Sequence, residues 1–439
     1  MVPILNQSLW RDEAFSALLS LKTPLQIILL SMKDATPPLH YLLLHYWMLL
    51  FGNTEVSMRG LSFILHLFTV LIIFFIVRRL THSISVQILI SFSVLLNPFL
   101  LQYAFEARAY SMLSFLITLA VYLAITKRYF LAGVALTLAV FTHNFAVFSL
   151  AAFIAWFLYH VRHRLKSATK EVLQFFLLPI ISLFIWGNVI WTQWVQVAGG
   201  FWIKQATSSM LINSLEKYAR GDLSYPTQPM LYTFSLILLF FAFSYWIWKD
   251  QKEEEGSSLL LIGFVILVPS LVTYFVSALF APIYNERYLI FTAPMLIILV
   301  GYSLTRLYNV RGTLHNVIIA VVAIYTVLLL QSSEQIVAMS TKPAINYAVS
   351  QVLSKVQTGD VIIPQDVLNF LETKYYVEKS GKNISVFAYS PSGKVPFYIG
   401  GILFEPQEIV REMPKYQRVW RIKPDGGYEL ESPKYVKLK

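Results

Sequence analysis

The sequence lacks cysteine altogether and is poor in charge: only 13% of its 439 residues are Asp, Glu, Lys or Arg. Without cysteine the chain can form no disulfide framework, no thiolate nucleophile and no cysteine metal site. The shortage of charge accompanies 56% hydrophobic residues and a mean hydropathy of +0.60, which excludes an ordinary soluble globular protein. The composition therefore predicts a polytopic membrane protein, mainly α-helical.

Ten apolar runs have lengths close to the roughly 20 residues with which a helix crosses about 30 Å of hydrocarbon. They lie near residues 57–77, 84–102, 110–126, 129–142, 145–161, 172–194, 230–248, 258–280, 288–308 and 313–331. Lys and Arg gather in every second connection, and the positive-inside rule places those connections in the cytoplasm. The net charge of +11 is thereby explained without nucleic acid, and no nucleic-acid partner is expected.

The remaining connections then lie outside the cytoplasm, in the cell envelope. We expect three parts: an external segment 1–56 with juxtamembrane helices, a transmembrane bundle 57–331 of about ten spans, and a small extracytoplasmic α/β domain 332–439. The run from Pro37 to Gly52 is short for a span and is expected to lie in the outer interface. Because residues 1–9 cannot act as a signal peptide, we expect a further span before Met1 in the natural chain; an unaided translocated tail is the alternative.

Polar groups occupy four of the outer segments, where apolar ones would cost less. These groups are Asp12 with Glu13, then Glu106 with Arg108 and Tyr110, then His143 with Asn144, and finally Glu286 with Arg287 and Tyr288. Each also has a structural interpretation: acids in the first turn of a helix, an interfacial ion pair, a helix cap, and an Arg neutralised by its neighbouring Glu.

Acids, a histidine and arginines gathered at one membrane face suit a reaction on an anionic lipid substrate. An acceptor hydroxyl is a poor nucleophile at neutral pH, so a carboxylate must take its proton as the new bond forms. A phosphate leaving group needs only cations to stabilise it. Asp12 suits the role of base, and Arg287 suits a bidentate phosphate clamp.

Five motifs in order resemble one family. They are "SLWRDEAFS", "TPPLHYLLLHYWMLLFGNTEVSMRGLSFIL", "LLNPFLLQYAFEARAYSML", "THNF" and "NERYLIFTAPMLIIL". The chain to about residue 331 is similar to the C-type (GT-C) membrane glycosyltransferases, in the group of protein O-mannosyltransferases and aminoarabinose transferases. This resemblance implies transfer of one sugar, with inversion, from a polyprenyl-phosphate carrier to an acceptor hydroxyl outside the cytoplasmic membrane.

By position, the resemblance implies that Asp12 is the catalytic aspartate, with Glu13 beside it, and that Glu106 is the second acidic position. Arg108, Tyr110, His143, Glu286 and Arg287 would contact the substrate or its phosphate. The external loop 195–229 resembles a mobile loop that closes over the substrates, with Lys204 as an added phosphate contact.

The expected partners are the polyprenyl-phosphate sugar donor, membrane lipid and an unidentified acceptor, which is a protein, a lipid or a glycan. No metal is expected to be obligatory, although Glu106 leaves a divalent ion such as Mg²⁺ or Mn²⁺ as an alternative. Two other functions stay open: a polymerase or ligase that uses a diphosphate-linked oligosaccharide, and a transporter or flippase for a lipid-linked sugar. The first would need more external arginine, and the second usually shows paired repeats.

Overall fold

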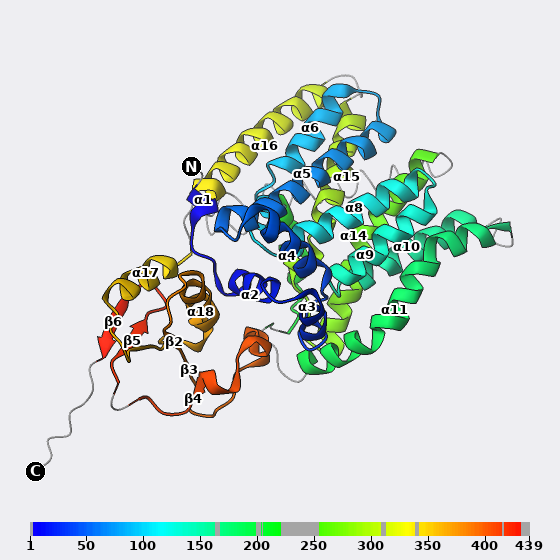
Figure 1. The fold of residues 1–439 in the computed structure, drawn as a ribbon. Coiled ribbons are helices and arrows are strands. Elements are labelled where there is room, and N and C mark those ends of the chain that lie inside the picture. Colours follow the sequence, from blue (N-terminus) through cyan, green and yellow to red (C-terminus); the bar gives the residue numbers. More distant parts are fainter. Residues whose placement is uncertain are drawn as a thin grey trace, which may run out of the picture. The chain divides into compact units, whose positions relative to one another are not determined.

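The chain divides into two compact units, each described by itself. A computed structural model describes residues 3–162, 167–198, 203, 205–220, 254–308, 313–338, 342–414 and 417–431. Unit 1 comprises Met1–Leu61 and Ala338–Lys439, and unit 2 comprises Ser62–Val337. Figure 1 colours the chain from its N-terminus in blue to its C-terminus in red.

Unit 2 is a bundle of apolar helices (Figure 1). Its helices are α5 (Glu55–Leu80, which begins in unit 1), α6 (Ile84–Leu95), α7 (Pro98–Ala104), α8 (Tyr110–Ile125), α9 (Tyr129–Thr142), α10 (Ala146–Val161), α11 (Thr169–Ala198), α12 (Met210–Arg220), α14 (Glu254–Leu279), η2 (Glu286–Leu289), α15 (Thr292–Tyr308) and α16 (Thr313–Ala338). Helices occupy nine of the ten predicted spans, and the run 230–248 lies outside the described residues.

By length and composition alone, fewer helices qualify as membrane spans than the ten that the sequence predicts. Within the described residues, Glu55–Leu80, Thr169–Gln196 and Gly256–Leu279 are long and apolar enough to cross a membrane, and α6 with α7 would make a fourth. Six further apolar helices are shorter. The shorter runs, such as 129–142, are helical as predicted, but their crossing of the bilayer stays a prediction.

One predicted span is bent. The run 84–102 forms α6 and α7, whose axes differ by 56°. The Asn97 side chain accepts a hydrogen bond of 3.0 Å from the backbone N–H of Leu100, and Pro98 is the first residue of α7. Asn as cap followed by Pro is a strong helix start, so the sequence itself begins a new helix there.

Close packing fixes α9 within the bundle. α9 packs against α8 and α11. A Cβ atom on Gly133 of α9 would lie 2.5 Å from the carbonyl oxygen of Phe175 in α11, so only glycine permits this approach. Phe175 also stacks on Tyr129, with ring centroids 5.6 Å apart. This packing fixes the N-terminal half of α9, and His143 follows the other end of the same helix.

Unit 1 begins with four short helices. They are α1 (Pro3–Asn6), α2 (Arg11–Ser20), α3 (Pro24–Ser31) and α4 (Leu39–Phe51). α4 covers most of the run that we expected to lie in the outer interface. Its end leaves Leu49, Leu50 and Phe51 more than half exposed, as an interfacial helix would.

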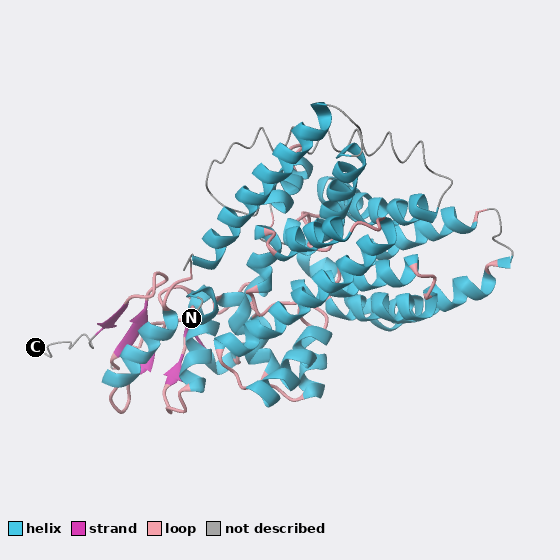
Figure 2. Ribbon diagram, turned by 90° about the horizontal axis from the view of Figure 1, so that it is seen from above, coloured by secondary structure: helices cyan, strands magenta, loops and turns pink. Residues whose placement is uncertain are grey.

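The C-terminal part of unit 1 is a small α/β fold, which Figure 2 shows as strands beside helices. Its elements are α17 (Ile345–Lys355), β1 (Val361–Ile362), η3 (Val367–Asn369), α18 (Phe370–Lys379), β2 (Ser385–Val386), β3 (Ala388–Tyr389), η4 (Phe397–Ile399), η5 (Gly401–Leu403), η6 (Pro406–Glu408), β4 (Ile409–Val410), β5 (Val419–Ile422) and β6 (Tyr428–Glu431). The main sheet has the order β2-β1-β5-β6, parallel except for β5 with β6. Val361, Ile363 and Val419 form its buried core.

The predicted fold class is confirmed: the chain is mainly helical, with a small C-terminal α/β part. Strands β4 and β6 were not predicted, because each is short and has no continuous apolar run. The C-terminal segment "YVKLK", whose alternating pattern favours a further strand, lies outside the described residues.

Candidate functional site

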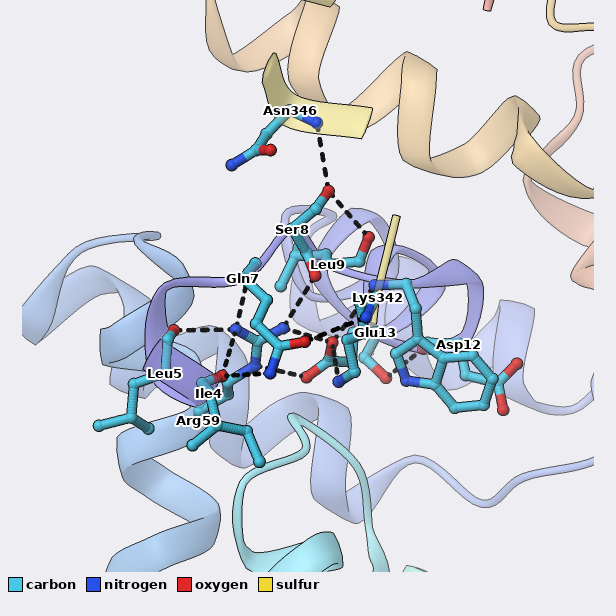
Figure 3. Close-up of polar contacts among 12 residues, drawn as sticks. Ile4, Leu5, Gln7, Ser8, Leu9, Asp12, Glu13, Arg59, Lys342 and Asn346 are labelled. Carbon is cyan, nitrogen blue, oxygen red and sulfur yellow. Dashed lines mark hydrogen bonds and ion pairs between the residues drawn. The ribbon is translucent and has the colours of Figure 1, made fainter. Parts of the chain in front are cut away.

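A buried ion pair joins the acidic motif to the start of α5 (Figure 3). Both oxygens of Glu13 accept bonds from Arg59, at 2.9 Å from Nε and 2.7 Å from Nη2, and neither side chain is exposed. Lys342 adds a second cation, with Nζ 2.9 Å from Glu13 Oε2. Glu13 is therefore neutralised from two sides and has a structural role here.

Arg59 also orders the N-terminal segment. Its guanidinium group donates to the backbone carbonyls of Ile4, Leu5, Gln7 and Ser8, at 2.8 to 3.2 Å. A buried arginine costs much free energy unless such partners satisfy its donors. The sequence reasoning missed Arg59; its signal was a charged residue close to the start of a long apolar run.

Asp12 behaves differently from its neighbour. It is the second residue of α2, its side chain is 20% exposed, and its Oδ1 lies 3.9 Å from Nε of Arg11. In Figure 3 its carboxylate lies on the side of α2 away from Arg59. Both acids do occupy the first turn of a helix, as the structural interpretation expected. Of the two carboxylates, only that of Asp12 is partly exposed.

A second polar cluster lies in unit 2, where Arg108 and Arg287 share the ring of Tyr110. Each guanidinium carbon is 5.8 Å from the centre of that ring, within the range of a cation–π contact. Tyr110 is 1% exposed and stacks against Tyr288, with centroids 6.3 Å apart. Two positive groups from distant motifs thus lie beside one buried aromatic pair.

Local structure orients Arg287. The Asn285 side chain accepts a bond of 3.1 Å from the backbone N–H of Arg287 and so begins the short helix η2. Arg287 lies 5.3 Å from the ring of Tyr288, and its Nη2 is 3.5 Å from that hydroxyl group. The preceding Glu286 pairs at 3.5 Å with Lys217 of α12, whereas the structural interpretation expected Arg287 as its partner.

His143 belongs to the same cluster. Its ring lies 5.1 Å from Tyr288 and 6.1 Å from Tyr110, and its Nδ1 accepts the backbone N–H of Phe145 at 3.2 Å. Burial, and then the charges of Arg108 and Arg287, lower the pKa of His143 to about 3. The imidazole is therefore neutral at pH 7, with its proton on Nε2, and it holds the N–H of Phe145 just before α10 without capping that helix.

Helix α12 brings part of the external loop to this cluster. Asn97 donates to the carbonyl oxygen of Tyr218 at 2.7 Å, and Ser214 bonds the hydroxyl of Tyr284 at 2.7 Å. These contacts, with the pair between Lys217 and Glu286, anchor α12 next to the Arg287 segment. Lys217 is the cation that the described part of the loop places there.

Comparison with known proteins agrees with this architecture. Residues 35–186 match the family model of dolichyl-phosphate-mannose-protein mannosyltransferases. The chain is similar to the crystal structure of ArnT from Cupriavidus metallidurans in the apo state, with a TM-score of 0.64 at 11% identity. The structure of the same protein bound to undecaprenyl phosphate gives 0.63 at 12% identity. Both alignments cover 96% of this chain and 90% of ArnT. The chain has a C-type glycosyltransferase fold.

This fold and the family model over residues 35–186 agree with the resemblance that the five motifs indicated, and the fold together with the apolar helices indicates a multi-pass membrane protein. No curated protein sequence matches the chain significantly. At such low identity the likeness to ArnT shows the fold, and the roles of individual residues must come from their own geometry.

Within the C-type fold, the predicted site residues form two groups. Arg108, Tyr110, His143 and Arg287 come together in unit 2. Glu106, two residues before Arg108, is 7% exposed. Asp12 and Glu13 lie in unit 1, and Lys204 lies outside the described residues.

Proposed function

We propose that the chain is a polyprenyl-phosphate-dependent membrane glycosyltransferase. It moves a single sugar from the lipid phosphate to an acceptor hydroxyl at the outer face of the cytoplasmic membrane. The observation that carries the proposal is the pair of guanidinium groups, Arg108 and Arg287, each 5.8 Å from the ring of Tyr110.

Two arginines beside an aromatic wall suit a phosphate on a lipid carrier. A guanidinium group binds phosphate oxygens in bidentate geometry, and stays charged at any physiological pH. The neutral His143 adds no competing charge and can donate from Nε2. Arg287 is therefore the proposed clamp, with Arg108 as its partner, and Lys217 on α12 is a further cation, paired with the neighbouring Glu286.

Asp12 is the proposed general base. Its carboxylate accepts the proton of the acceptor hydroxyl while the oxygen attacks the anomeric carbon of the sugar. The bond from that carbon to the phosphate oxygen breaks in the same step, and the lipid phosphate leaves with the bonding electrons. A single displacement of this kind inverts the anomeric centre. Glu13 cannot share this role, because Arg59 and Lys342 already occupy its oxygens.

The comparisons support the lipid part of the proposal. ArnT, whose fold this chain shares, has been crystallised with undecaprenyl phosphate, and the matching family model is named for dolichyl-phosphate-linked mannose. Both carriers are polyprenyl phosphates. We propose no obligatory metal, since the two arginines already supply the positive charge that a departing phosphate needs.

The test is a transfer assay in liposomes that contain the purified protein and radiolabelled polyprenyl-phosphate sugars. Asp12→Asn should abolish transfer and leave the amount of folded protein unchanged. The matched control is Asp425→Asn, the same change in a turn of unit 1 where Asp425 accepts only the N–H of Gly427. Unchanged transfer by Asp12→Asn would remove Asp12 from the mechanism. Absence of transfer by the unmodified chain, with every donor offered, would contradict the proposed function.

A further inference from the structure

The start of α2 lacks a cap from its own sequence. Trp10 occupies the N-cap position, and an indole ring has no oxygen with which to accept the free N–H groups of the first turn. Glu13 reaches back to the Trp10 N–H, at 3.3 Å, but the next donors need another acceptor. Asp12 lies in this same turn, so whatever holds the turn also sets the direction of its carboxylate.

Glu372 of α18 supplies that acceptor from a distant part of the sequence. Its side chain is 3% exposed and lies near the backbone N–H of Arg11, the first residue of α2, with which its carboxylate interacts favourably. The Asn369 side chain donates to Glu372 Oε2 at 2.6 Å and fixes the carboxylate from the other side. A carboxylate at a helix N-terminus is also favoured by the helix dipole.

A second side chain of α18 holds the residues just before α2. The hydroxyl of Tyr376 accepts the backbone N–H of Leu9 at 2.7 Å and lies 3.3 Å from Ser8 Oγ. Tyr376 follows Glu372 by four residues, so both lie on one face of α18. Two side chains of one rigid helix therefore face this segment: Tyr376 bonds the N–H of Leu9, and Glu372 lies near the N–H of Arg11.

Packing completes the contact between α2 and the C-terminal part of unit 1. Gly400 has φ of +79°, and a Cβ atom there would lie 2.5 Å from Cδ2 of Phe15 in α2. Lys342, from the same part, reaches Glu13 as described above. The first and second turns of α2 thus rest on residues more than 300 positions away in the chain.

We propose that Glu372 is a positioning residue for sugar transfer: as the cap of α2 it holds Asp12 in the direction that proton abstraction requires. The inference rests on the proposed function, because it takes Asp12 as the base. It gives the C-terminal α/β part a task in catalysis, although this part supplies no group that contacts the reacting atoms.

The test compares two substitutions at one position. Glu372→Ala removes the carboxylate near the N–H of Arg11, so the amide of Arg11 should exchange hydrogen faster in the purified full-length chain. The kcat of transfer should fall by about ten- to a hundredfold, since small misplacements of a catalytic group have effects of this size. The KM for the lipid donor should change less than twofold. Glu372→Gln keeps one acceptor oxygen for the Arg11 N–H and should restore most of kcat.

Glu378→Gln is the matched control on the same helix. Its carboxylate is about half exposed and lies 4.0 Å from Lys374, so exchange at α2 and kcat should stay as in the unmodified chain. If Glu372→Ala fails to fold, Tyr376→Phe removes the neighbouring acceptor and should give faster exchange at the amide of Leu9, with a smaller loss of kcat.

Three results would overturn the inference: unchanged exchange and kcat in a folded Glu372→Ala protein, a Gln variant as impaired as the Ala variant, or an equal loss in kcat and donor affinity. The exchange measurement needs no activity. A failure of the proposed function, seen as no transfer by the unmodified chain, is therefore distinguishable from a failure of this inference.

Discussion

Glu13 and Arg59 form a bidentate ion pair in which neither side chain is exposed to solvent. The pair joins α2 to the first turns of α5 across 46 residues. Because Arg59 also binds four backbone carbonyls of the N-terminal segment, the acid at position 13 has a structural role in unit 1, and we propose the chemical role for the acid at position 12.

Breaking this pair should be severe. Glu13→Gln leaves the buried Arg59 with a neutral partner, and the loss of one member of a buried pair costs about 3–5 kcal/mol. We expect a large drop in the thermal unfolding midpoint of the detergent-solubilised protein. Lys342→Met removes the less buried cation, whose side chain is 14% exposed, and should cost about 1 kcal/mol. An equal decrease in stability from the two substitutions would show that Lys342 contributes as much to the pairing of Glu13 as Arg59 does.

Removal of either clamp arginine should weaken binding of the lipid donor. Arg287→Ala and Arg108→Ala each remove charged hydrogen bonds worth about 1.5–3 kcal/mol, so the KM for the donor should rise by about tenfold or more. Tyr110→Phe keeps the ring between them and should change that KM less than threefold. The measurement is transfer at varied donor and acceptor concentrations; a rise in the acceptor KM alone would exclude a phosphate clamp.

Helix positions followed readily from the sequence, because a long apolar run has few alternatives in a membrane protein. The bend between α6 and α7 was missed although its signal, Asn97 before Pro98, was present. A hydropathy window averages over such a cap, whereas the local hydrogen bond of Asn97 decides the chain direction.

The site was predicted in part for a different reason. Arg108, Tyr110, His143 and Arg287 could be selected because polar residues at the ends of apolar runs need an explanation. Lys342 and Glu372 stand in an ordinary amphipathic sequence, and only the fold brings them to Glu13 and Arg11. Similarly, no feature of the sequence distinguishes the buried Glu13 from its more exposed neighbour.

Chelation of divalent ions should leave transfer unchanged. The proposed phosphate site takes its positive charge from Arg108 and Arg287, so incubation with excess EDTA, followed by assay in metal-free buffer, should change kcat less than twofold. Restoration of a lost rate by added Mg²⁺ or Mn²⁺ would show that the ion is required. In that case Glu106→Gln should abolish the restoration, since Glu106 is the acid next to Arg108.

The stability of unit 1 should fall as pH rises toward neutrality, because of Glu372. Burial raises the pKa of Glu372 from 4.5 to about 7, and Asp12 raises it further, against the lowering by Asn369 and Arg11. Between these two pH values the folded chain holds a proton that the unfolded chain has released, so the free energy of unfolding decreases as pH increases.

Glu372 alone changes the free energy of unfolding by about 3 kcal/mol at most. This stabilisation is fully present below pH 4.5 and is lost above pH 7. Glu372→Gln has no proton to release there. The difference in unfolding midpoint between the Gln variant and the unmodified chain should therefore increase, in favour of the variant, from pH 4.5 to pH 7.5. The comparison cancels the contributions of all other groups, and a constant difference would show that Glu372 ionises as freely in the folded chain as in the unfolded one.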